Sequence, residues 1–164
     1  VRSKFLVAAV LGGLTLFFGG LVFILLLRSY LPIVTTEKVL ESQWIPFFHA
    51  LTVGDGVPYL AIVLYLSFLS GALWGSVGLC ASAYFPSNYV AVCFPFIFRF
   101  LLVQIGRLLK LPDGMRLDRL LVARGTIYSD SVTIVVTTMA VLAFILLCYR
   151  LFMRRMERRI WDEE

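Results

Sequence analysis

Residues that carry enzyme chemistry are scarce in this sequence of 164 residues. There is one histidine, His49, and no serine or cysteine stands at a catalytic spacing from it. The sequence lacks a nucleophile elbow, a phosphate-binding glycine loop, a metal-ligand pair and paired aspartates within its apolar segments. We therefore expect a protein that is not an enzyme and holds no metal or cofactor, with His49 near a membrane surface.

Cysteine is also rare. The three cysteines, Cys80, Cys93 and Cys148, lie inside apolar segments and follow no metal-site or disulfide pattern. They are expected to pack as small apolar side chains. The sequence has neither an internal repeat nor a low-complexity linker, and its length fits a single domain over residues 1–164.

Apolar residues, in contrast, are abundant. They make up 60% of the chain, and the mean hydropathy is +0.92, which is too apolar for a soluble domain. Four apolar runs, at about 5–27, 58–84, 89–109 and 132–149, have lengths near the roughly 20 residues that a membrane crossing needs. The sequence thus predicts an all-α integral membrane protein with four transmembrane helices.

The residues between the predicted spans supply turns and short helices. Residues 106–130 are amphipathic, since Leu117, Leu120 and Leu121 fall at helical spacing while Arg116, Asp118 and Arg119 can face elsewhere, and they predict one or two short interfacial or re-entrant helices before the last span. Residues 128–131 offer an N-cap to that span. Pro58 is placed to open the second span, and Pro95 is expected to kink or break the third.

Arg99 is a charge inside a predicted span, where insertion costs several kcal/mol. One interpretation is that Arg99 faces a bundle interior or a polar pathway. The other is that Pro95 ends the deep part of the span and that the arginine side chain reaches a head-group level. Both interpretations stay open from the sequence.

Small residues are concentrated in two of the apolar runs. The second run carries a broad small-residue face, which predicts close helix packing or, alternatively, a polar translocation surface. The first run carries four glycines that could let a neighbouring helix approach. These residues are Gly12, Gly13, Gly19 and Gly20 in the first run, and Ser67, Ser70, Gly71, Gly75, Ser76, Gly78, Ala81, Ser82 and Ala83 in the second.

The basic residues set an expectation for orientation. Seven Lys or Arg residues lie before the first predicted span or after the last. Another seven lie in or beside the predicted loops on the opposite side of the membrane. Five arginines of residues 150–164 follow directly on the last span, which favours both termini in the cytoplasm and a basic tail beside anionic lipid. This tail is short and ends in acidic residues, so we expect no nucleic acid as a partner.

A family resemblance is carried by residues 67–102. Leu73–Leu79, then Ser82, then Phe85–Ala91 and Pro95–Phe96 resemble the fourth and fifth helices of type 2 ATP-binding-cassette exporter permeases, particularly the bacterial branch near peptide and lantibiotic export. In that family a helix ending in small residues meets a short cytoplasmic corner before a Pro-Phe helix. The remaining apolar segments follow in the family's order.

The resemblance implies a function and a set of partners. It implies a permease component of an exporter in the plasma membrane, paired with itself or a homologue and driven by a separate subunit that binds ATP. The corner Pro86, Ser87 and Asn88 would couple the two subunits, and both termini would be cytoplasmic. Such permeases have six spans, so two further helices are expected upstream of Val1.

A different class of function also fits the sequence. A small membrane scaffold or accessory protein would bind partner helices and transport nothing. A neighbouring gene for an ATPase would favour the permease, and an isolated short gene the scaffold. An intramembrane enzyme is the third hypothesis, and the missing residue pairs argue against it.

Overall fold

The computed structural model describes residues 2–30, 47, 50, 56–85, 87–112, 116–125 and 127–162. His49 lies outside these residues. The described residues form an all-α chain, as predicted. The helices within these described residues are α1 (Arg2–Tyr30), α4 (Val57–Tyr84), α5 (Asn88–Leu108), α6 (Leu117–Leu120) and α7 (Asp130–Asp162).

Three of the described helices are long and apolar enough to cross a membrane, over Ser3–Leu27, Val57–Tyr84 and Asp130–Glu157. At about 1.5 Å per residue each extends well beyond the ~30 Å of a hydrocarbon core. The chain therefore has the features of a multi-pass membrane protein. Helix α5 coincides with the predicted third span but is not one of these three helices.

The local sequence explains where the helices begin. Gly56 precedes α4 with a φ of 77°, a left-handed conformation that costs glycine little, and Pro58 lies in the first turn as predicted. At the start of α7 the backbone N–H of Val132 donates to the Ser129 hydroxyl at 3.4 Å, which confirms the predicted cap. Helix α5 continues through Pro95 without a break.

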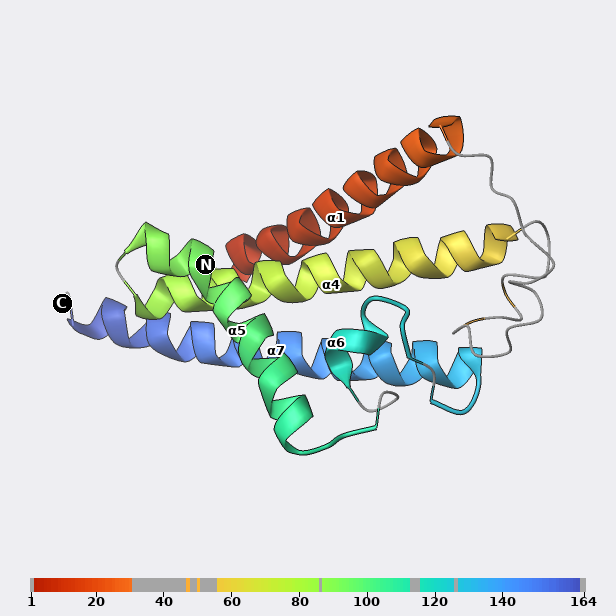
Figure 1. Ribbon diagram of the computed structural model, residues 1–164. Helices are drawn as coiled ribbons and strands as arrows, with labels where there is room; N and C mark the ends of the chain where they lie inside the picture. Colours follow the sequence, from red (N-terminus) through yellow and green to blue (C-terminus); the bar gives the residue numbers. More distant parts are fainter. Residues whose placement is uncertain are drawn as a thin grey trace.

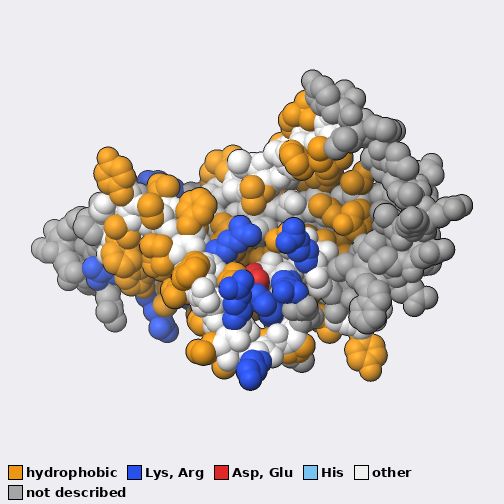
Figure 2. Space-filling model, viewed as in Figure 1, with side chains coloured by type: hydrophobic (Ala, Val, Ile, Leu, Met, Phe, Trp, Pro, Cys, Tyr) orange, Lys and Arg blue, Asp and Glu red, His pale blue; other side chains and the backbone are white. Residues whose placement is uncertain are grey.

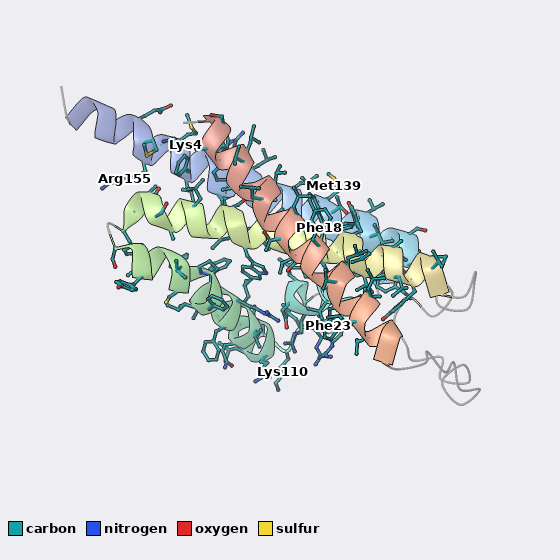
Figure 3. All side chains as sticks on the ribbon, turned by 90° about the horizontal axis from the view of Figure 1, so that it is seen from above. Lys4, Phe18, Phe23, Lys110, Met139 and Arg155 are labelled. Atoms are coloured by element: carbon teal, nitrogen blue, oxygen red, sulfur yellow. The ribbon has the colours of Figure 1, made fainter. Side chains whose placement is uncertain are left out.

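Helix α4 is the central helix of the bundle, because α1, α5 and α7 each pack against it. Figure 1 shows α4 and α7 side by side, with α1 along the opposite side of α4 and α5 diverging from the other helices. Seen from above, α1 crosses obliquely over α4 while α5 runs along the other flank (Figure 3). The short helix α6 lies between α5 and α7.

Glycines bring the backbones of α1 and α4 into direct contact. A Cβ atom added to Gly12 would lie 2.5 Å from the carbonyl oxygen of Gly71, and one added to Gly75 would lie 2.7 Å from that of Ala8. Only residues without a side chain permit such an approach, which is the packing expected of small residues in lipid. A Cβ atom added to Gly19, in contrast, would meet nothing within 4 Å outside its own helix, so Gly19 takes no part in this contact.

Aromatic and hydroxyl contacts join the chain ends to the α4–α5 corner. Phe5 of α1 is buried between Tyr149 and Phe152 of α7, with ring centroids 5.4 and 5.7 Å away. The Tyr84 hydroxyl at the end of α4 donates to the Leu151 carbonyl at 3.1 Å. The start of α1, the end of α7 and the corner therefore lie at one end of the bundle (Figure 1).

Further contacts hold α7 and α5 to α4. The hydroxyls of Tyr65 and Thr138 are 3.0 Å apart, and the side chains of Cys80 and Cys148 pack together in the apolar core. On the other flank the Phe98 ring of α5 lies 6.3 Å from Trp74. The sequence did not reveal the cysteine contact, because the two thiols are 68 positions apart.

Helix α7 runs further than the predicted span of 132–149. It continues unbroken to Asp162, so most of the basic segment 150–164 extends the same helix. Phe152 accounts for part of this extension, because its buried ring packs on Phe5 and carries the apolar side of the helix beyond residue 149.

Candidate functional site

Arginines from separate parts of the chain surround one cavity of about 700 Å³. Figure 2 shows Lys and Arg side chains gathered around a single acidic side chain, with apolar surface on either side. We call this the arginine cavity. Its ionisable lining consists of Tyr59 from α4, Arg99 and Arg107 from α5, and Arg116, Asp118, Arg119 and Arg124 from the segment that contains α6.

The chain reverses after α5 and so brings α6 back to the arginines of α5. Lys110 follows α5 with a φ of 49°, and the Leu111 N–H donates to the Gly106 carbonyl at 3.1 Å. Gly106 is buried, and a Cβ atom there would meet Arg116 Nε at 3.4 Å. Leu120 is buried and fixes α6 to the bundle. The Arg116 side chain therefore lies directly against α5 at Gly106.

One carboxylate stands among the five guanidinium groups. Arg116 donates to both oxygens of Asp118, from Nε at 3.4 Å and from Nη2 at 3.1 Å, and the two side chains are only 9% and 14% exposed. Because guanidinium groups keep their charge at all physiological pH values, one aspartate among five arginines leaves the lining with a formal charge of +4. The cavity therefore favours anions.

An apolar groove of about 370 Å³ adjoins the arginine cavity, between α1, α4 and α5. Leu16, Trp74 and Phe96 line this groove, and Gly71 and Gly75 also face it. Arg99 belongs to both linings, so the polar cavity and the apolar groove meet at its side chain.

The two sites predicted from the sequence lie apart. Arg99 lines the arginine cavity with an exposed side chain. The predicted coupling corner lies at the end of the bundle that holds both termini. There Ser87 is exposed directly before α5, whereas Pro86 and the side chain of Asn88 lie outside the described residues.

The convergence on Arg99 was not predicted. From the sequence, Arg107 and Arg124 indicate orientation, and Arg116 and Arg119 also form the polar side of a predicted amphipathic segment. One available signal is that Arg107 follows Arg99 by about two helical turns. Another is the arginine excess of residues 116–124, which hold a single aspartate. Neither signal reveals the chain reversal that brings the two groups together.

Metal ligation has no support in the described part of the chain, where histidine, cysteine, aspartate and glutamate side chains form no group of three or more that could hold an ion. No family model matches the sequence, and neither a curated protein nor a solved structure does. Function is therefore inferred from the residues of the chain itself.

Proposed function

We propose that the chain is a membrane-spanning permease component of an ATP-binding-cassette exporter, driven by a separate ATPase subunit. The observation that carries the proposal is the position of Arg99, a charge in the middle of α5 that lines a polar cavity beside apolar helices. A charge held at membrane depth is costly and is typically kept for a ligand or ion pathway. In this proposal α5 also crosses the membrane, in addition to α1, α4 and α7.

The arrangement of the chain ends supports the proposed topology. The start of α1, the corner between α4 and α5 and the end of α7 lie together, so one side of the membrane would hold both termini and the corner. The arginine-rich segment 150–159 at this end favours the cytoplasm. The corner could then receive movement from an ATPase on that side.

The exposed apolar face of α1 offers a surface for lipid or for a second permease chain. Leu6, Val10, Phe18 and Phe23 are each about half exposed or more. Pairing with the same chain or with a homologue would cover this face, as the proposed exporter requires.

Affinity purification of the chain from its native membrane, followed by mass spectrometry, tests the proposal. We expect an ATPase subunit to be recovered in amounts comparable to the chain itself. Recovery of membrane partners without any ATPase would refute the permease and would support the scaffold hypothesis.

The corner can be tested in the recovered complex. The double variant Pro86→Ala/Asn88→Ala is expected to lower the ATPase rate of the reconstituted complex several-fold at unchanged abundance in the membrane. Pro112→Ala, beyond the other end of α5, is the matched control and should leave the rate unchanged. An unchanged rate in the double variant would remove the corner from the mechanism.

A further inference from the structure

We propose that the arginine cavity and the adjoining apolar groove bind one anionic lipid of the surrounding bilayer. Its phosphate head group lies among the arginines and one acyl chain lies in the groove. This inference goes beyond the proposed function, because it concerns binding by the chain alone, without an ATPase and without transport.

Charge identifies the head group. The lining carries five arginines against Asp118, and that aspartate is already engaged by Arg116. An entering phosphate would lower the repulsion among the guanidinium groups of the lining. Guanidinium groups also match phosphate oxygens in paired hydrogen bonds, which makes arginine well suited to this anion. Tyr59 belongs to the same lining, and a tyrosine hydroxyl can donate a further hydrogen bond.

Shape identifies the rest of the ligand. The cavity of about 700 Å³ and the groove of about 370 Å³ are each within the usual range of ligand pockets. The groove takes an extended apolar group because Leu16, Trp74 and Phe96 line it. Arg99 lines both spaces, so it would lie where the head group joins the acyl chain.

Access favours a bilayer lipid over a free anion. The surface of α5 beside the site exposes Phe100, Leu101 and Ile105, and Figure 2 shows apolar surface on both sides of the basic cluster. A lipid could therefore enter laterally with its chain in contact with protein or lipid throughout. Inorganic phosphate would leave the groove empty and would gain only the interactions of the head group.

Tryptophan quenching tests both halves of the site. The full chain is purified in a neutral detergent and titrated with phosphatidylglycerol that carries bromine on its acyl chains, which quenches tryptophan on contact. We expect saturable quenching that is largely lost in Trp74→Phe, because Trp74 lines the groove. Brominated phosphatidylcholine, whose head group has no net charge, should quench at least tenfold more weakly at equal concentration.

A matched pair of charge variants isolates the cavity. Arg107→Gln/Arg124→Gln removes two exposed arginines of the lining and should raise the Kd for phosphatidylglycerol about tenfold or more. Arg150→Gln/Arg154→Gln removes two exposed arginines of α7 outside the lining and should change it less than about twofold. Circular dichroism of both variants verifies that the helices are intact.

Three results would overturn the inference. Equal quenching by the two lipids would remove the role of charge, and equal losses in the two double variants would indicate general surface attraction. Competition by inorganic phosphate at the same concentration as the lipid would indicate a free-anion site with no role for the groove. Each result leaves the recovery of an ATPase unaffected, so this inference and the proposed function can fail separately.

Discussion

The backbone contact between α1 and α4 yields the sharpest prediction, for the substitution Gly71→Ala. The added Cβ atom would overlap the Gly12 carbonyl oxygen and lie 2.8 Å from its carbon and 3.0 Å from the Gly13 Cα. All three atoms belong to the backbone, so no side chain can rotate away. The two helices must separate or shift along each other.

The expected loss follows from two opposing terms. Inserting a methyl group into a packed contact costs about 1–3 kcal/mol. Alanine favours a helix over glycine by about 0.5–1 kcal/mol, which offsets part of that cost. Gly19→Ala makes the same chemical change where nothing lies within 4 Å, so it gains the helix term alone. The difference between the two variants therefore isolates the contact, at about 1–3 kcal/mol.

Unfolding in mixed micelles measures this difference. The two variants are titrated with sodium dodecyl sulfate and followed by circular dichroism and tryptophan fluorescence. Gly71→Ala should unfold at a lower mole fraction of dodecyl sulfate than Gly19→Ala, with an unfolding constant about 5- to 150-fold larger. Equal midpoints for the two variants would refute the close approach of α1 to α4.

Two further predictions concern contacts of α4 and α7. Oxidation with copper phenanthroline should link Cys80 to Cys148 and leave Cys93 reactive toward maleimide, because only the first two thiols are in contact; mass spectrometry without that linked peptide would contradict the packing. Thr137→Val should stabilise the protein by about 1 kcal/mol, since the Thr137 hydroxyl is buried without a partner among the described residues. Thr133→Val, which removes the acceptor 2.8 Å from the Ile127 N–H, should instead cost about 1–3 kcal/mol of unfolding free energy, and a loss in both variants would show that the Thr137 hydroxyl is satisfied.

The helical segments could be predicted because their signals are local. The length of an apolar run can be counted along consecutive residues, and Pro58 and Ser129 each act on the helix turn beside them. The predicted ends of the second span agree with α4 to within one residue. The end of α7 could not be predicted in this way. Its continuation beyond residue 149 is accompanied by packing of Phe152 on Phe5, a contact between the two ends of the chain.

The candidate site depended on contacts that no local pattern contains. Arg99 was identified because a charge in an apolar run is anomalous wherever the run folds. Arg116 and Arg119 look ordinary in an amphipathic segment, and they gain significance only because that segment returns to line a cavity with the arginines of α5. The sequence therefore identifies Arg99, because its neighbours in the chain are apolar. It does not identify Arg116 and Arg119, because their importance depends on where the folded chain places them.

The unbroken course of α7 has a mechanical consequence. Its 33 residues form a rod of about 50 Å, roughly 20 Å longer than a hydrocarbon core. Arg150 and Arg154 are four positions apart, so they mark one side of this rod with a spacing of about 6 Å. If the membrane-embedded part of α7 tilts, the rigid extension moves these charges sideways. A protein bound to them would be displaced by the same movement.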